Sequence, residues 1–473
     1  MPKTTIKHTG RSFSKGHNKL LDYLVDQKIS INAICGGRGR CGLCRARIVK
    51  PKSPNEIDTL LIDPKLLKKG YRLACQYPID DGLEVIVPKT KIVRYSSRTP
   101  KRFGLALDLG TSTIKAAVVD LKSGKTTKKT TVFNPQNSLG GDVMTRIGAA
   151  DEGNYKKLRE QLLFGIEIAT ERLGTPKPIF TIVVGNPVML SFYLNKSVSG
   201  LSHYPFKSEI KEGKFLKNPP RYVFPIIGGF VGGDTIAGII ASNIGHREGI
   251  FLYIDLGTNG EIAVIKKDKI IVLSAAAGPA FEGVGISRGS LAIPGAIDRI
   301  SYNRGFRFST IDDKKPIGFC ASGLIDLIAI LLSHGWLQED GRLVRKIKIN
   351  GLGITQDDIR KLQLATGAIH TGIEVLLQKA GVKPSEVDEA ILTGEFGSSL
   401  NSKSLRRIGI LPNGIKKIRL KNDLPLQGAL KVLLDNSALE QVRRIEKMSE
   451  HLELASEPDF QKKFVSNLKL APW

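Results

Sequence analysis

The spacing of hydrophobic positions near the start of the chain changes from a helical to a strand period. The stretch LLDYLVDQKISINAICGG, which begins at Leu20, predicts a helix, a short connection and a glycine-rich loop. The segments CRARIVK and LEVIVPKTKIV carry β-branched residues at alternate positions, which predicts strands. We therefore expect a small mixed module of helix and strands over residues 1–98.

A second pattern begins at Phe103 and occurs twice. The segment FGLALDLGTSTIKAAVVDL predicts a strand, a tight turn rich in glycine and threonine, and a second strand. The segment FLYIDLGTNGEIAVIKK repeats this order from Phe251, about 150 residues later. An internal repeat of this kind predicts two homologous lobes, each of which mixes strands with helices.

Helical periodicity and a short polar segment complete the domain plan. We expect helices over residues 155–173, 235–243, 322–333, 356–380 and 437–454. The polar segment YSSRTPK predicts a linker. The predicted fold class is α/β with an α+β module at the N-terminus. The predicted parts are the module at 1–98, a linker at 99–102, a first lobe at 103–248, a second lobe at 249–436 and a charged C-terminal helix or tail at 437–473.

Composition restricts the class of protein. The chain has 473 residues, of which 41% are hydrophobic, so a disordered chain is excluded. Residues 324–332, LIDLIAILL, form one of the longest mostly apolar runs and are far short of the roughly 18–20 residues that span a bilayer. The first residues are polar and lack the apolar core of a signal peptide. We expect a cytoplasmic protein that does not enter a membrane.

The formal net charge of +26 raises the question of a nucleic-acid partner. Residues 1–98 hold 20 Lys and Arg against 8 Asp and Glu, a net charge of +12, and the remaining residues have a net charge of +14. The chain has no long basic run, and aromatic residues make up only 6%. We therefore expect no nucleic-acid partner.

Four of the five cysteines lie in the N-terminal module. Cys35, Cys41, Cys44 and Cys75 follow the spacing C-x5-C-x2-C-x30-C, with the first three on one glycine-rich loop. Four thiolates can hold a [2Fe–2S] cluster, and three ligands on a tight loop are typical of plant-type ferredoxins. A structural zinc site is the alternative, but such sites usually pair two short C-x2–4-C knuckles. The isolated Cys320 is expected to be a packed core residue.

The two DLGT turns suit a phosphate ligand. The backbone N–H groups and threonine hydroxyls of such a turn can donate to phosphate oxygens, and the aspartate at the end of the first strand can organise Mg²⁺. Two turns, one in each lobe, would hold a nucleotide from both sides of a cleft. The candidate phosphate-binding residues are Gly110, Thr111, Ser112 and Thr113 in the first turn, and Gly257, Thr258, Asn259 and Gly260 in the second.

This arrangement resembles the actin, sugar-kinase and Hsp70 superfamily of two-lobed ATPases. A later glycine segment contacts the adenosine in that superfamily, and ILTGEFGSSL is similar to it, with Gly394 and Gly397 at the turn. The resemblance implies that Asp108 and Asp255 organise Mg²⁺ and the attacking water as catalytic residues. It also implies that ATP is the nucleotide.

The whole chain resembles one family, the ATP-dependent reductive activators of corrinoid proteins. The resemblance is carried by TIVVGNPVML, GLSHYPF, IGGFVGGDTIAGII, YIDLGTNGEIAV, SAAAGPAFEGVGI, CASGLIDL, DDIRKLQLATGAIHTGI and NDLPLQGAL, in the family's order. It implies a β-grasp [2Fe–2S] ferredoxin-like domain before a two-lobed actin-like ATPase. Many members are longer, and we expect this chain to lack the middle domain that they carry between these two parts.

The resemblance also implies a reaction and partners. One electron from a low-potential donor would pass through the cluster to a corrinoid methyl carrier and convert Co(II) to Co(I), with ATP driving the step. A homodimer is implied as well. A metabolite kinase and a non-enzymatic, nucleotide-gated redox switch are the alternatives. The basic segment RGRCGLCRAR, which includes Arg38, Arg40 and Arg45, is expected to steer an acidic partner.

Overall fold

The computed structural model describes most of the chain and divides it into two compact units. The described residues are 3–7, 19–27, 29, 31, 39, 42, 44–79, 83–88, 102–174, 177–394, 400–435 and 437–473. One unit comprises Met1–Thr181 with Met189–Ser202, and the other Ile182–Val188 with His203–Trp473. The predicted linker at 99–102 lies outside the described residues except for Arg102.

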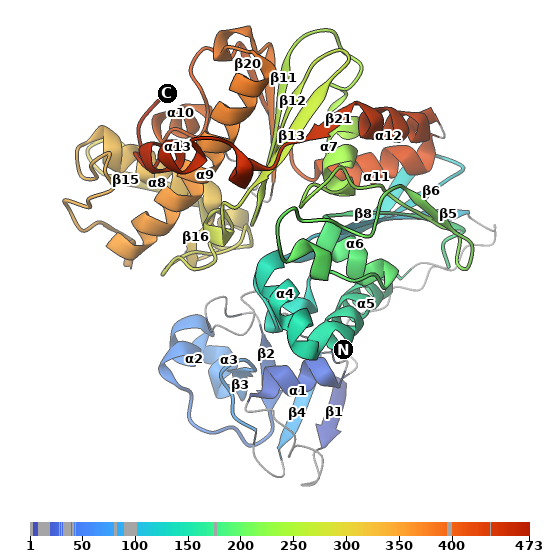
Figure 1. Ribbon diagram of the computed structural model, residues 1–473. Helices are drawn as coiled ribbons and strands as arrows, with labels where there is room; N and C mark the ends of the chain where they lie inside the picture. The colour runs from blue at the N-terminus through green and yellow to red at the C-terminus, as the bar shows by residue number, and fades with distance from the viewer. Residues whose placement is uncertain are drawn as a thin grey trace. The chain divides into compact units, whose positions relative to one another are not determined.

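The N-terminal module is a four-stranded sheet with a helix packed on it (Figure 1). The strand order is β1-β4-β2-β3, and the pairs for which the register is given are antiparallel. Helix α1 packs through Leu20, Leu21 and Leu24 against the buried face of the sheet. The elements are β1 (Lys3–Lys7), α1 (Leu20–Asp26), β2 (Arg45–Ile48), α2 (Glu56–Leu61), α3 (Pro64–Lys68), β3 (Tyr71–Leu73) and β4 (Glu84–Pro88).

The rest of the first unit is built around an antiparallel meander. Strands β5, β6 and β7 pair in sequence, and helix α5 packs on β6 and β7. They belong to a sheet of order β7-β6-β5-β8-β10-β9, and the boundary between the units falls within β8. The elements are β5 (Phe103–Leu109), β6 (Thr113–Asp120), β7 (Lys125–Phe133), η1 (Pro135–Ser138), α4 (Val143–Ala149), η2 (Ala150–Asn154), α5 (Tyr155–Leu173), β8 (Phe180–Gly185), α6 (Pro187–Leu194) and η3 (Ser199–Leu201).

A six-stranded sheet of order β20-β19-β11-β12-β13-β21 forms the centre of the second unit. The even-numbered positions Leu252 and Ile254 of β11 join helices α8 and α9 in one apolar core. Tyr253 points to the opposite face, where a side chain at Gly238 of helix α7 would collide with its hydroxyl. Helices therefore cover both faces of this sheet, with α7, α11 and α12 on the second face (Figure 1).

The bounds of the second unit's elements follow. The strands are β9 (Lys214–Leu216), β10 (Arg221–Val223), β11 (Phe251–Leu256), β12 (Gly260–Ile265), β13 (Ile270–Ala275), β14 (Ala296–Tyr302), β15 (Phe306–Thr310), β16 (Gly318–Phe319), β17 (Lys348–Ile349), β18 (Leu352–Gly353), β19 (Glu389–Gly394), β20 (Lys417–Leu420) and β21 (Ser449–His451). The helices are α7 (Gly233–Ser242), η4 (Pro279–Glu282), η5 (Ile311–Asp313), α8 (Ala321–Ser333), α9 (Gln356–Ala380), η6 (Pro384–Glu386), α10 (Ser402–Arg407), α11 (Leu424–Leu434), α12 (Ser437–Met448), η7 (Leu454–Ser456) and α13 (Phe460–Ser466).

The C-terminal segment differs from the sequence prediction. A helix was expected over residues 437–454, but α12 ends at Met448 and residues 449–451 form strand β21, parallel to β13. Val442 and Ile445 are buried, as is Leu470 near the end of the chain. The segment is therefore part of the packed second unit, and its predicted helix is present but ends six residues earlier than expected.

Candidate functional site

Two of the four predicted cluster cysteines lie within the described residues. Cys44 directly precedes β2 and Cys75 closely follows β3, and these two strands pair antiparallel with Arg45 opposite Leu73. The ladder continues past the strands, because the N–H of Ala74 donates to the carbonyl of Cys44 at 2.8 Å. Neither cysteine is in a disulfide, and both are buried. The pairing brings Cys44 and Cys75 to the same end of the sheet; Cys35 and Cys41 lie outside the described residues.

The loop before Cys44 requires glycine at two positions. Gly39 and Gly42 have φ angles of +68° and +65°, a region that residues with a Cβ rarely adopt. A Cβ on Gly42 would also lie 2.9 Å from the carbonyl oxygen of Leu61. The side-chain amide of Gln76 donates to the Cys75 sulfur at 3.6 Å, as groups around a thiolate ligand commonly do. This donor set fits an iron–sulfur cluster.

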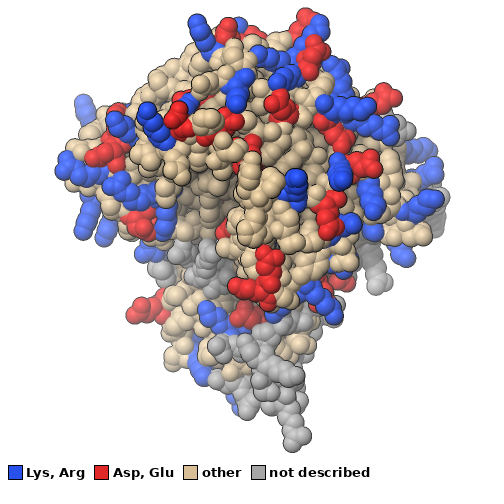
Figure 2. Space-filling view, viewed as in Figure 1, with Lys and Arg blue, Asp and Glu red and all other residues tan. Residues whose placement is uncertain are grey.

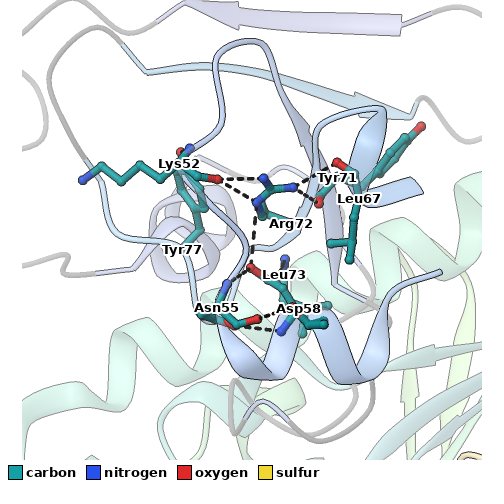
Figure 3. Close-up of polar contacts among 9 residues, drawn as sticks. Lys52, Asn55, Asp58, Leu67, Tyr71, Arg72, Leu73 and Tyr77 are labelled. Carbon is teal, nitrogen blue, oxygen red and sulfur yellow. Dashed lines mark hydrogen bonds and ion pairs between the residues drawn. The ribbon is translucent and has the colours of Figure 1, made fainter. Parts of the chain in front are cut away.

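A buried ion pair supports the segment that leads to Cys75 (Figure 3). The Arg72 guanidinium donates to the carbonyl oxygens of Lys52, Leu67 and Tyr71 at 2.7–3.2 Å. Its Nε lies 4.0 Å from Oδ2 of Asp58, whose other oxygen accepts the N–H of Leu73 at 2.9 Å. Asp58 is thereby tied to the strand two residues before Cys75.

Side chains of the same unit hydrogen-bond to the backbone of the first predicted phosphate turn. Three consecutive carbonyl oxygens of the turn each accept a side-chain hydrogen bond. Asn134 Nδ2 donates to Gly110 at 3.0 Å, Arg146 Nη2 donates to Thr111 at 2.6 Å, and Asn137 Nδ2 donates to Ser112 at 3.2 Å. Arg146 is fully buried and also donates to Asn137 Oδ1. Asp108 and Thr113, at the two strand ends, are buried as well. The turn is therefore a fixed element of the first unit.

The second predicted turn lies in the second unit. Its Gly257 N–H donates to the carbonyl of Asn259 at 2.9 Å, and the Thr258 hydroxyl donates to Glu282 Oε1 at 3.0 Å. Glu282 ends the short helix η4 in the segment AGPAFEG. Gly394, at the end of β19, pairs in register with Leu256, so it lies beside this turn. Gly397 lies outside the described residues.

Three carboxyl groups surround the base of the second hairpin. Glu261 of β12 pairs directly with Asp255 of β11, so their side chains share a face of the sheet. Burial raises the pKa of Asp234, near the start of α7, to about 7, and the charge of Asp255 adds to this rise. Burial also raises the pKa of Glu261 well above its usual value, with contributions from Asp234 and Asp255. The structure therefore brings Asp255 together with two acids that the sequence did not single out for catalysis.

Several contacts of the predicted turns could not be found from the sequence. Arg146 and Glu282 each reach a predicted turn from a segment 24 or more residues away, and no local pattern marks either of them. Asp234 lies in the segment IGGFVGGDTIAGII, which carries the family resemblance but does not by itself mark a site residue. Cys320 is buried with its sulfur near the carbonyl of Ile297, which confirms it as a packed residue.

Comparisons with known proteins find three family models that together match most of the chain. The model of the 2Fe-2S iron-sulfur cluster binding domain matches residues 4–80, that of the RACo middle region residues 103–247, and that of the C-terminal ASKHA domain of RACo residues 249–352 and 345–472. The corrinoid activation enzyme RamQ of Eubacterium limosum is 31% identical over 441 residues, which cover 82% of this chain and 74% of RamQ. The chain belongs to the RACo family of reductive activators of corrinoid proteins.

Other members agree with this assignment. The [Co(II) methylated amine-specific corrinoid protein] reductase of Methanosarcina barkeri is 29% identical over 423 residues, 77% of this chain and 76% of the reductase. A solved structure of a reductive activator for corrinoid, iron-sulfur protein superposes with a TM-score of 0.73 at 25% identity and covers 96% of each chain. The ferredoxin-like module and the actin-like ATPase fold predicted from the sequence are confirmed.

The comparisons correct one expectation. We expected no middle domain between the ferredoxin module and the ATPase part, but the model of the middle region matches residues 103–247. This region carries the first DLGT turn, whereas the ASKHA model begins at residue 249 and carries the second. That residues 103–248 act as the first ATPase lobe stays a prediction. Among the described residues, none of the helices is long and apolar enough to cross a membrane.

Proposed function

We propose that this protein uses ATP to deliver one electron to the cobalt of a corrinoid methyl-carrier protein and so converts inactive Co(II) to Co(I). The observation that carries the proposal is the fusion, in one chain, of a ferredoxin module to an ATPase domain of the RACo type. An electron carrier and an ATPase belong together when the electron transfer is uphill without ATP. A gap of 59 mV in a one-electron step corresponds to about 1.4 kcal/mol, so ATP turnover can drive a gap several times larger.

The four cysteines of the N-terminal module are the proposed ligands of a [2Fe–2S] cluster. Cys35, Cys41 and Cys44 would hold it from the glycine-rich loop and Cys75 from the segment that follows β3. The bound cluster supplies a one-electron carrier, with a potential near about −400 mV in plant-type ferredoxins. The burial of Cys44 and Cys75 and the Gln76 donor support this assignment because they keep water away and stabilise a thiolate.

The two DLGT turns and the β19 turn are the proposed ATP site. Asp108 and Asp255 would organise Mg²⁺ and the attacking water, since both lie at the end of a first hairpin strand. The fixed backbone of the first turn and the carboxyl group beside the second support these roles. The proposed nucleotide-binding residues are Gly110, Thr111, Ser112, Thr113, Gly257, Thr258, Asn259, Gly260, Gly394 and Gly397.

The proposed partners follow from the reaction. A low-potential cytoplasmic donor would reduce the cluster, and a corrinoid protein would accept the electron. RamQ is described as a corrinoid activation enzyme and the Methanosarcina protein as a reductase of a Co(II) corrinoid protein, which supports the corrinoid partner. We also propose a homodimer, which size-exclusion chromatography with light scattering would test.

The reaction can be tested with purified components. The protein, purified without oxygen, is expected to be brown and to contain two irons per chain. A Co(II) corrinoid carrier and a reductant are then added with or without ATP, and the cobalt spectrum is followed. We expect Co(I) only with ATP. Failure to form Co(I) with every candidate carrier, while ATP is still hydrolysed, would contradict the proposal and favour a kinase or a redox switch.

A further inference from the structure

The side chain of Gln76 is directed at the sulfur of a proposed cluster ligand. Gln76 follows Cys75 in the chain, and its Nε2 donates to Cys75 Sγ at 3.6 Å. A thiolate sulfur accepts hydrogen bonds and donates none, so a bound cluster requires the nitrogen of this amide, and not its oxygen, on the sulfur side. The cysteine spacing does not mark this contact, because it identifies only the ligands themselves.

The backbone around Cys75 holds Gln76 in a fixed position. The N–H of Gln76 donates to the carbonyl of Leu73 at 2.9 Å, which closes a turn over residues 73–76. The N–H of Leu73 donates to the buried carboxylate of Asp58 at 2.9 Å. Leu73 is therefore bonded through both of its backbone groups, and the side chain of Gln76 starts from a rigid point beside the ligand.

The glycine-rich loop leaves room for the Gln76 amide at Gly39. A Cβ on Gly39 would lie 2.8 Å from Gln76 Nε2 and 3.0 Å from its Cδ. Gly39 lies between Cys35 and Cys41 in the sequence, on the loop that is proposed to carry three of the four ligands. The amide therefore lies against this loop while it donates to the fourth ligand.

The sulfur of Cys75 is in surroundings where one donor has a large effect. Cys75 is 1% exposed and Gln76 is partly buried, so water has little access to this sulfur. Hydrogen bonds are stronger in such surroundings than in water, because the local dielectric constant is low. The reduction potential of an iron–sulfur cluster depends on hydrogen bonds to its sulfurs, on net charge and on solvent exposure.

We propose that Gln76 sets the reduction potential of the ferredoxin module: its N–H bond to Cys75 Sγ stabilises the reduced, more negative state and so raises the potential. Gln76 acts through Cys75, so it is a positioning residue and not a catalytic one. This inference rests on the proposed iron–sulfur site and deepens it, because it names a residue outside the ligand set that tunes the electron carrier.

The direction of this effect divides the work of the proposed reaction. The module takes one electron from a donor and passes it to Co(II). A higher potential makes the first transfer easier and the second more uphill, since the same electron is held more tightly. The bond from Gln76 therefore lets a weaker reductant fill the module and leaves the uphill transfer to cobalt to be driven by ATP.

A redox titration of the full-length protein, followed by electron paramagnetic resonance, measures the potential without a corrinoid partner. Gln76→Leu keeps a side chain of similar size but has no donor. At a fixed solution potential, its ratio of reduced to oxidised protein should fall about ten-fold, or about 59 mV for one electron, as expected for one lost hydrogen bond to a charged group. The midpoint does not depend on how many chains carry iron, so a partly loaded variant still gives a result.

Variants of different charge separate a tuning role from a packing role. Gln76→Glu keeps the shape but replaces the N–H by a negative charge, so its potential should lie below that of Gln76→Leu. Gln76→Lys keeps a donor and adds a positive charge, so its potential should lie at or above that of wild type. Gln27→Leu is the matched control: it removes an exposed amide at the end of α1 in the same module and should leave the potential unchanged.

Two results would overturn the proposal. A Gln76→Leu potential equal to that of wild type would show that the amide does not act on the potential. Equal shifts in all three Gln76 variants, whatever their charge, would assign this side chain a packing role only. A wild-type protein that binds no iron, or that binds zinc instead, would contradict the proposed function itself, so the two kinds of failure are distinguishable.

Discussion

A buried carboxylate, Asp58, supports the strand that leads to Cys75. The side chains of Asp58 and Arg72 are 3% and 5% exposed, so neither charge is solvated. Removal of one member of a buried pair leaves the other charge uncompensated, which costs about 3–5 kcal/mol. We expect Asp58→Ala to lower the free energy of unfolding of the ferredoxin module by about this amount and to reduce the iron bound per chain. Denaturant unfolding followed by cluster absorbance measures both effects.

Asp63 offers a matched control for this prediction. It is an exposed aspartate of the same module and caps helix α3 by accepting the N–H of Lys65 at 2.7 Å. Loss of such a cap costs about 1 kcal/mol. Asp63→Ala should therefore keep its iron, and equal losses in the two variants would mean that the buried pair has no special role.

His370 gives the second unit a pH-dependent stability. It stacks on the ring of Trp473 at a centroid distance of 4.0 Å. Burial lowers its pKa to about 4, although the negative charge of Glu374 acts to raise it. The unfolded chain, with a histidine pKa near about 6.5, binds more protons than the folded chain between these values. Stability should therefore fall as the pH drops from about 6.5 toward 4.

Histidine variants test this pH dependence. His370→Phe keeps an aromatic ring against Trp473 but cannot take up a proton. Its melting temperature should fall less steeply than that of wild type between pH 7 and pH 5. The same change at the exposed His203 should leave the slope of wild type, and identical slopes for all three proteins would contradict the role of His370.

Candidate ligands that follow a known spacing along the chain could be predicted from the sequence. Residues that reach a site only through a contact between distant segments could not. The cysteine spacing identified Cys44 and Cys75, and the β2–β3 ladder places them at one end of the sheet. The acceptor of the Thr258 proton, Glu282, is 24 residues away and ends a helix that has no recognised motif. This contact exists only in the folded chain, so no local pattern in the sequence marks Glu282 as a neighbour of the turn.

Among the secondary-structure elements, strong caps made the bounds predictable. Helix α9 has the predicted bounds, since Thr355 and Asp358 form a capping box at its start and Gly381 ends it with a φ of +60°. Helix α5 also has its predicted bounds, and its C-cap is Gly174 with a φ of +58°. Strand β21 could not be predicted, because it has three residues and exists only through its pairing with β13. Tertiary pairing there overrides the helical pattern.

The first DLGT turn leaves no room for a side chain at its glycine, Gly110. A Cβ on Gly110 would lie 2.6 Å from the carbonyl oxygen of Thr113, which is backbone and cannot rotate away. We expect Gly110→Ala to distort the turn and to weaken ATP binding at least ten-fold, or about 1.4 kcal/mol. Isothermal titration in EDTA measures this loss directly.

Gly148 is the matched control for the turn glycine. It lies in helix α4 of the same unit, and nothing lies within 4 Å of its added Cβ. Alanine there should be neutral or slightly stabilising, since glycine within a helix is unfavourable by roughly 0.5–1 kcal/mol. ATP binding that is unchanged in Gly110→Ala would show that the turn does not contact the nucleotide.

At the scale of the whole molecule, much of the positive charge has local partners. On the face shown in Figure 2, Lys and Arg side chains lie among Asp and Glu rather than in one patch. The buried Glu389, for example, contacts Arg247, Lys417 and Arg419. Charges used in this way stabilise the fold and do not require a polyanionic partner. The net charge of +12 in residues 1–98 is the part that still needs a functional explanation.

The basic segment around the proposed cluster ligands suits an acidic electron-transfer partner, but one of its arginines has a structural contact that makes it unsuitable for testing this. Arg45 donates through Nε to the carbonyl of Gly42, so its reversal would also disturb the cluster loop. We therefore expect the double reversal Arg38→Glu and Arg40→Glu to slow electron transfer to the corrinoid protein while iron content and ATP hydrolysis stay near wild type. The rate should also fall as salt rises, because long-range steering is screened within about 10 Å at 0.1 M salt.

Reversal of the exposed Lys122 and Lys125, at the β6–β7 turn, changes the net charge equally and should leave the rate unchanged. Equal slowing by both pairs would mean that net charge, and not the position of the basic segment, governs the encounter.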